Sequence, residues 1–269
     1  MRLHTRHETF YDYETPLSYS VQRLYLTPQN FDAQKIIDWK ITALGIEGAL
    51  TYLDGFGNRI HLVTIQNTDG PMSVIAEGIV DVTDASGVVK NLPCPAPDAI
   101  FLRQTAATRP SSEILEMIEK INSRGRDKLD LLHALMTEIR TAVTYTIGVT
   151  NADTTAAEAF AAGQGVCQDH AHIFSGAVRH LGIPARYVTG YLALEGGESA
   201  TASHAWAEAL LPDLGWVGFD PANGKCPTDH YVRVAGGIDA HGITPIRGSR
   251  KGGSTEKMRV EVNVEIAQQ

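Results

Sequence analysis

The sequence predicts an α+β protein in which an antiparallel β-domain precedes a core of helices and antiparallel strands. Three observations support this order: strand-like segments fill residues 2–82, segments with helical periodicity follow up to residue 181, and three further strand-like segments come after them. A length of 269 residues suits one large or two modest domains. We therefore expect a β-rich domain over residues 1–95 and a core over residues 96–269.

The expected β-domain depends on strand-forming residues separated by turns. Tyr, Thr and Val are frequent in HETFYDYE and SYSVQRLYL, and the turn signals DGFGN and NTDGP separate these segments from RIHLVTI and MSVIAEGIVDV. Three prolines in NLPCPAP, residues 91–97, are typical of an extended connector. This connector places the expected domain boundary near residue 95.

Apolar residues at helical spacing predict the helices of the core. They are Ile114, Leu115, Ile118 and Ile121 in one segment, and Leu132, Leu135, Met136 and Ile139 in the next. Thr155 and Glu158 have the spacing of a capping box at the start of a short Ala-rich helix, which Gly163 and Gly165 end. A further helix begins at or just after Cys167 and stops at GIP, residues 182–184.

The segments ARYVTGYLAL, HAWAEALL and GWVGFDP predict three strands, separated by a loop over residues 195–203 and the turn PDLG. Apolar and polar residues alternate in RVEVNVEIA, so a last strand is expected near residues 258–267, packed on either domain. Between them, RGSRKGGSTEK, residues 247–257, is expected to be an exposed loop.

Composition and charge exclude several classes of partner. The net charge of −8 provides no basic surface, so neither nucleic acid nor an anionic membrane is expected as a partner. The N-terminus is polar and no apolar run approaches 18 residues, so we expect neither a signal peptide nor a membrane span. Three widely spaced cysteines predict no disulfide framework. A cytoplasmic protein follows, whose oligomeric state the sequence leaves open.

Cys167 is the candidate nucleophile. The partial positive charge at a helix N-terminus, together with a nearby imidazolium, can stabilise a thiolate. His204 follows 37 residues later at the start of a strand, and Asp220 closes the next strand after 16 more. Two antiparallel strands can place this His and Asp side by side. Each residue also has a structural explanation: an inert buried thiol, a turn histidine and an Asp-Pro turn.

Two long motifs, GQGVCQDHAHIFSGAVRHLGIPARYVTGYL and SHAWAEALLPDLGWVGFDPANG, resemble the core of the bacterial transglutaminase-like proteins, a branch of the papain-like cysteine peptidase and transglutaminase superfamily. The stretch SVQRLYLTP, with Gln34, Trp39 and DGFGN, resembles the β-rich region that often precedes this core. The similarity covers nearly the whole chain. It implies a papain-like core and a catalytic triad of Cys167, His204 and Asp220.

The resemblance implies acyl transfer, in which Cys167 attacks a peptide or carboxamide carbonyl and forms a thioester. We expect hydrolysis of a peptide, protein or amide substrate by a cysteine protease or amidase. One alternative is a transglutaminase with an amine acceptor, and another is a binding or scaffold module without turnover. The backbone N–H of Cys167 is a candidate oxyanion donor, and Gln164 is a weaker one.

The neighbours of Cys167 suggest no metal or cofactor site. Cys167, His170 and His172 do not project together from one helix, so no zinc site is expected, and Asp169 in the first turn should satisfy local donors. Trp206 fits either a groove wall or core packing.

Two further features are the remaining cysteines and the segment of residues 236–248. Cys226 fits a bystander better than a resolving thiol, and no role is assigned to Cys94. GGIDAHGITPIRG, residues 236–248, departs from the GRDYADVPPxRG of the family, because Ile238 and Ala240 replace Arg and Tyr. This change affects the expected substrate recognition rather than the triad.

Overall fold

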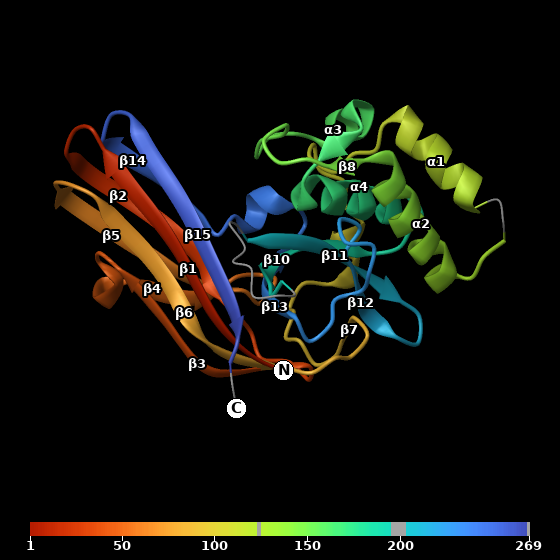
Figure 1. Ribbon diagram of the computed structural model, residues 1–269, viewed down its shortest axis with the longest axis horizontal. Coiled ribbons are helices and arrows are strands. Elements are labelled where there is room, and N and C mark those ends of the chain that lie inside the picture. The colour runs from red at the N-terminus through yellow and green to blue at the C-terminus, as the bar shows by residue number, and fades with distance from the viewer. Residues whose placement is uncertain (123–124, 195–202, 268–269) are drawn as a thin grey trace.

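The computed structural model describes residues 1–122, 125–194 and 203–267, and it shows two packed parts. One part is built of long strands, and the other carries all four α-helices of the described chain (Figure 1). Residues 195–202 of the predicted loop lie outside the described residues. Among the described helices, none is both long enough and apolar enough to cross a bilayer.

The strand-rich part consists of two four-stranded antiparallel sheets, which confirms the predicted β-domain. The order in one sheet is β15-β1-β6-β3, and in the other β14-β2-β5-β4. Their bounds are β1 (Arg2–Tyr13), β2 (Leu17–Thr27), β3 (Gln34–Ala43), β4 (Leu50–Leu53), β5 (Arg59–Thr68), β6 (Met72–Val82), β14 (Ile246–Gly252) and β15 (Glu256–Ile266), with the 3₁₀ turn η1 (Ile46–Gly48) between β3 and β4. Every second residue of β6 is buried, as expected where one face of a sheet covers a core.

The C-terminal segment returns to this β-domain. The last strand, β15, pairs with β1, from Leu3 opposite Ile266 to Tyr13 opposite Glu256. The exposed loop predicted over residues 247–257 is wrong, because β14 occupies most of it and pairs with β2. β14 is an edge strand with exposed Arg and Lys side chains, so it lacks the alternation by which a half-buried strand is recognised.

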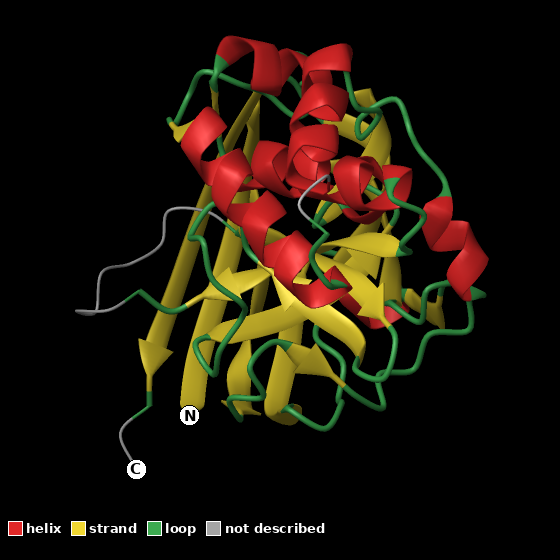
Figure 2. Cartoon of the chain, turned by 90° about the vertical axis from the view of Figure 1, so that its right-hand side faces the viewer, coloured by secondary structure: helices red, strands yellow, loops and turns green. Residues whose placement is uncertain are grey.

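The other part is a five-stranded antiparallel sheet with helices on one face. Its order is β13-β10-β11-β12-β7, with β7 (Val88–Val89), β10 (Ala185–Leu192), β11 (His204–Leu211), β12 (Gly215–Phe219) and β13 (Tyr231–Gly237). The helices are α1 (Ser112–Asn122), α2 (Lys128–Ala142), α3 (Ala156–Ala162) and α4 (Cys167–His180). The view in Figure 2 shows these helices gathered above the sheet. Short elements complete this part: the parallel pair β8 (Thr144–Tyr145) and β9 (Gln164–Gly165), and the 3₁₀ turns η2 (Asp98–Leu102) and η3 (Ala240–Ile243).

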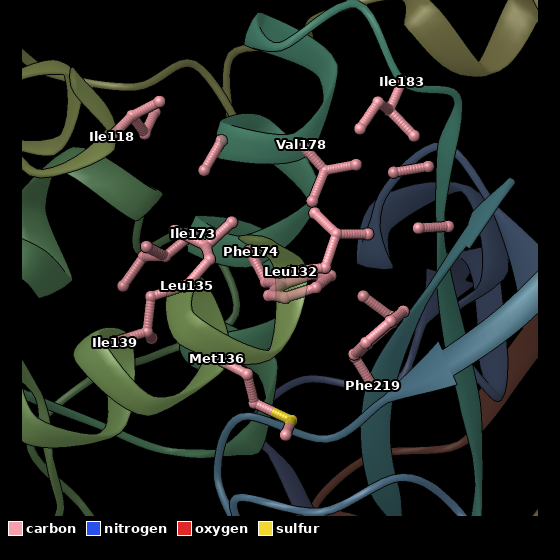
Figure 3. Packing of buried hydrophobic residues seen from close by; sticks show 14 of the residues in the cluster. Ile118, Leu132, Leu135, Met136, Ile139, Ile173, Phe174, Val178, Ile183 and Phe219 are labelled. Atoms are coloured by element: carbon pink, nitrogen blue, oxygen red, sulfur yellow. The ribbon is translucent and has the colours of Figure 1, made fainter. Parts of the chain in front are cut away.

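The helix α4 lies between the other helices and the sheet. Nearly all of its side chains are buried, and Figure 3 shows Ile173, Phe174 and Val178 within the apolar cluster. The ring of Phe174 stacks on that of Phe219 from β12, with centroids 5.2 Å apart. The predicted apolar face of α2 packs into the same cluster, through Leu132, Leu135, Met136 and Ile139. This packing fixes α4 against the sheet that supplies His204.

Candidate active site

The local sequence places Cys167 at the first residue of α4. Gly163 ends α3 in a left-handed conformation with φ 65°, and β9 leads directly into α4. The capping box predicted for α3 is present, with Thr155 and Glu158 in reciprocal hydrogen bonds. In α4, Asp169 accepts hydrogen bonds from the N–H of Val166 at 2.8 Å and from Thr150 Oγ1 at 2.7 Å. Asp169 therefore satisfies local donors, as predicted.

His204 and Asp220 come from neighbouring strands, β11 and β12. The two strands are antiparallel, with Ala207 opposite Phe219, so the start of β11 lies beside the end of β12. His204 Nε2 donates to Asp220 Oδ2 over 2.7 Å. The structure therefore places this pair in direct contact, with the Asp220 side chain fully buried.

Three further hydrogen bonds hold the Asp220 carboxylate. Oδ2 accepts from Asn223 Nδ2 at 2.7 Å and from the Tyr231 hydroxyl at 2.8 Å, and Oδ1 accepts from the N–H of Asn223 at 3.2 Å. Burial alone would raise the pKa of Asp220, but the bonds from His204, Asn223 and Tyr231 outweigh it and hold the pKa below its ordinary value. Asp220 is therefore a carboxylate at neutral pH.

The His204 imidazole is held as a cation. Burial lowers the pKa of His204, but hydrogen bonds and charge interactions with Asp220 and Cys167 outweigh it and raise the pKa to about 10. Nε2 of this ring is bonded to Asp220, and Cys167 is the other group that favours the cation. The structure thus brings together the three residues that were predicted as a triad.

Tyr145 also lies beside Cys167, and no sequence pattern indicated it. Its hydroxyl interacts with Cys167, and its side chain is half exposed on β8. Burial and the neighbouring Cys167 together raise the pKa of Tyr145 to about 12, so the hydroxyl keeps its proton at neutral pH. The register of β8 and β9, with Tyr145 opposite Gly165, places Tyr145 beside the start of α4.

Asn223 and Tyr231 were also missed. Asn223 lies three residues after Asp220 in the turn that follows β12, and its spacing is the one signal that could have indicated it. Tyr231 reaches Asp220 from the first residue of β13, which is not adjacent to β12 in the sheet. Only the folded sheet brings Tyr231 and Asp220 together.

Trp206 packs against His204 and is buried. Its side chain is 2% exposed, and its ring lies 6.2 Å from that of His204 and 5.5 Å from that of Tyr231. Gly190 in β10 makes room for it, because a Cβ atom there would lie 2.7 Å from the indole. Of the two readings of Trp206, core packing is therefore correct.

Gln164 and His172, two further residues near Cys167 in the sequence, have other surroundings. Gln164 is exposed on β9, while His172 Nε2 accepts a hydrogen bond from the N–H of Ala240 at 3.1 Å. Burial lowers the pKa of His172 to about 4, so its ring is neutral. Within the described chain, no three His, Cys, Asp or Glu side chains are grouped to hold a metal ion.

The other two thiols lie outside the triad. Cys226 is partly buried, which raises its pKa to about 11, so its thiol stays protonated at neutral pH. Cys94 is partly exposed, and like Cys226 it forms no disulfide.

The segment 236–248, which departs from the family sequence, packs close to the nucleophile. Ala240 and Ile243 belong to the same buried cluster as Cys167 and Tyr187. The bond from Ala240 to His172 fastens η3 to α4. Changes of residue in this segment therefore alter the surroundings of Cys167.

Comparison with known proteins finds two family matches along the chain. Residues 116–221 match the transglutaminase-like superfamily, and residues 3–81 match the bacterial transglutaminase-like N-terminal region. The chain is 26% identical to an uncharacterized protein of Mycobacterium leprae over 98% of both chains. It is 28% identical to an uncharacterized protein of Mycobacterium tuberculosis, over 98% of this chain and 92% of the relative.

A solved structure has the same fold. It is described as a "Putative Cysteine Protease" from Cytophaga hutchinsonii, with a TM-score of 0.76 and 22% identity. The match covers all of this chain and 92% of that one. The two family matches identify the chain. It belongs to the transglutaminase-like superfamily, with a bacterial transglutaminase-like N-terminal region ahead of the core that carries Cys167, His204 and Asp220.

Proposed function

We propose that this protein catalyses cysteine-dependent acyl transfer, with hydrolysis of a peptide or carboxamide bond as the reaction. One observation carries the proposal: the buried Asp220 holds the His204 imidazole at 2.7 Å, and Asp220 and Cys167 together raise the pKa of that imidazole to about 10. An imidazolium beside a thiol at a helix N-terminus favours the thiolate, the reactive form.

In the first half of the reaction, the Cys167 sulfur attacks the substrate carbonyl and a carbon–sulfur bond forms. The carbonyl oxygen becomes an oxyanion, for which the N–H of Cys167 is the candidate donor, since helix geometry leaves it without an intrahelical acceptor. His204 gives its proton to the leaving amine and the carbon–nitrogen bond breaks. A thioester and a free amine result.

In the second half, His204 takes a proton from water and the hydroxide adds to the thioester. The carbon–sulfur bond then breaks, which releases a carboxylic acid and regenerates the thiolate and the imidazolium. Asp220 remains a carboxylate throughout and holds the ring in orientation. Its hydrogen bonds from Asn223 and Tyr231 keep it from turning away.

Transglutaminase activity is the second candidate, because the core matches the transglutaminase-like superfamily. In that reaction an amine takes the place of water as the acceptor of the acyl group. The first half-reaction is the same, so the two functions differ only in what reaches the thioester.

One assay separates these candidates from each other and from a scaffold without turnover. The protein is incubated with a library of peptides that includes glutamine side chains, together with a tagged primary amine. New peptide termini or ammonia without tag indicate hydrolysis, whereas incorporated tag indicates transamidation. Cys167→Ala is the control, and turnover that persists in this variant would overturn the proposal.

A further inference from the structure

His170 is a buried imidazole that the proposed reaction does not use. It lies in the first turn of α4, three residues after Cys167, and its side chain is 1% exposed. Its Nδ1 atom lies 2.9 Å from the carbonyl oxygen of Val166, and its Nε2 atom lies 2.9 Å from that of Val143. Both ring nitrogens therefore face hydrogen-bond acceptors.

These two contacts determine the protonation state of the ring. A carbonyl oxygen can only accept a hydrogen bond, and a neutral imidazole carries a single N–H. A neutral ring would leave a bare nitrogen facing a carbonyl oxygen inside the protein, which is unfavourable. Both hydrogen bonds form together only when both nitrogens carry a proton.

The ring connects the two segments that supply Cys167 and Tyr145. Val166 is the residue before Cys167 and caps α4, while Val143 links α2 to β8, two residues before Tyr145. The ring of Tyr145 lies 6.2 Å from that of His170 and is tilted by 33°. His170 therefore joins the start of α4, which carries Cys167, to β8, whose Tyr145 hydroxyl interacts with Cys167.

The strand pair itself gives little support to Tyr145. β8 and β9 pair over two residues each, and they are extended by the bonds from Thr144 N to Gly163 O and from Thr146 N to Gly165 O, both 2.9 Å. Tyr145 is half exposed, so few packing contacts restrict it. A contact that fixes Val143 to α4 then determines where the Tyr145 hydroxyl lies.

We propose that His170 is a positioning residue: a buried imidazolium that, by bonding Val143 and Val166 at once, holds the Tyr145 hydroxyl against the sulfur of Cys167. This inference rests on the proposed function in one respect only, namely that the sulfur of Cys167 is the proposed nucleophile. The charge state and the coupling to Tyr145 are properties of the resting protein, and both can be measured without a substrate.

The first test is the charge state in the wild-type protein. In protein labelled with ¹⁵N-histidine at neutral pH, the ring identified by its contacts with Val143 and Val166 should show two protonated nitrogens. The neutral ring of His172 provides an internal comparison. A single protonated nitrogen on His170 would overturn the proposal, and this measurement needs no variant to fold.

The second test is a double-mutant cycle between His170 and Tyr145. The readout is the rate at which iodoacetamide alkylates Cys167. His170→Phe keeps a ring beside Tyr145 but removes both donors, and should slow alkylation about tenfold in the wild-type background and less than about twofold in a Tyr145→Phe background. Equal slowing in both backgrounds would mean that His170 does not act through Tyr145.

Two conservative variants and a control complete the design. His170→Gln can retain the donor toward Val143 and His170→Asn the donor toward Val166, so each should recover part of the lost rate. His172→Phe removes another buried imidazole from α4. In this variant, Tyr145→Phe should still change the alkylation rate of Cys167 as much as it does in the wild type. If His172→Phe abolished that effect as well, general disruption of α4 would explain the result and the proposal would fail. The peptide assay with Cys167→Ala tests the proposed function separately.

Discussion

Replacing Asp220 with Asn tests whether one carboxylate sets the charge of the His204 ring. The amide keeps the shape of the side chain but removes its charge. Asp220 Oδ2 accepts from three donors, and Oδ1 accepts from the N–H of Asn223. An amide that directs its oxygen to His204 must place its NH₂ group against the N–H of Asn223, so one contact is lost in any orientation.

The size of the effect follows from the pKa of His204, which stands at about 10 against an ordinary value of 6.5. That difference corresponds to about 5 kcal/mol in favour of the imidazolium, at roughly 1.4 kcal/mol for each pKa unit. This is a net value, because burial lowers the pKa whereas Asp220 and Cys167 both raise it. Because burial alone lowers the pKa of His204, the ring of the Asn variant should be neutral at neutral pH.

The assay is alkylation of Cys167 by iodoacetamide at about pH 6, where a thiol without a cationic partner scarcely reacts. We expect Asp220→Asn to slow it by ~100-fold or more, which corresponds to about 2.7 kcal/mol and is roughly half of the net preference for the imidazolium. Asp153→Asn, which changes an exposed carboxylate, is the matched control. Unchanged alkylation in Asp220→Asn would refute the role assigned to the carboxylate.

Three further predictions concern the stability of the fold and site. Tyr231→Phe removes a donor 2.8 Å from the buried Asp220 carboxylate. Urea titration should show a loss of about 1.5–3 kcal/mol of unfolding free energy, and a loss below about 0.5 kcal/mol would contradict the account. Phe174→Ala removes a fully buried ring that stacks on Phe219. It should cost about 3–5 kcal/mol in the same measurement, and a cost under about 1 kcal/mol would mean that α4 is not fixed by this packing. The raised pKa of His204 makes its charge stabilising below pH 6.5 and progressively less so as the pH rises to about 10. The difference in unfolding free energy between wild type and His204→Gln should therefore shrink as the pH rises over this range. A difference that grows with pH would contradict a raised pKa of His204.

Features fixed by neighbouring residues could be predicted from the sequence. The capping box of Thr155 and Glu158 spans four residues, and the apolar face of α2 repeats within one helix. Cys167 at a helix start, and His204 and Asp220 on adjacent antiparallel strands, also follow from local patterns and a short connection. Such signals do not depend on the rest of the fold.

Features that depend on distant pairing could not be predicted in the same way. Tyr145 reaches Cys167 through a two-residue parallel pairing between segments about 20 residues apart, too short to leave a periodic pattern. Tyr231 meets Asp220 from a strand that is not its neighbour in the sheet. β14 was missed because an exposed edge strand with Gly, Arg and Lys has the composition of a loop.

The most direct test of the central claim is competition among the three thiols of the wild-type protein for a limiting amount of iodoacetamide. The labelled peptides are counted after reaction at about pH 6. Cys226, whose pKa burial raises to about 11, and Cys94, which lies outside the triad, serve as references within the same molecule. We predict that Cys167 reacts at least ~10-fold faster than either, although it is the most buried of the three. Labelling of Cys94 before Cys167, or equal rates at all three, would contradict an activated thiolate at the start of α4.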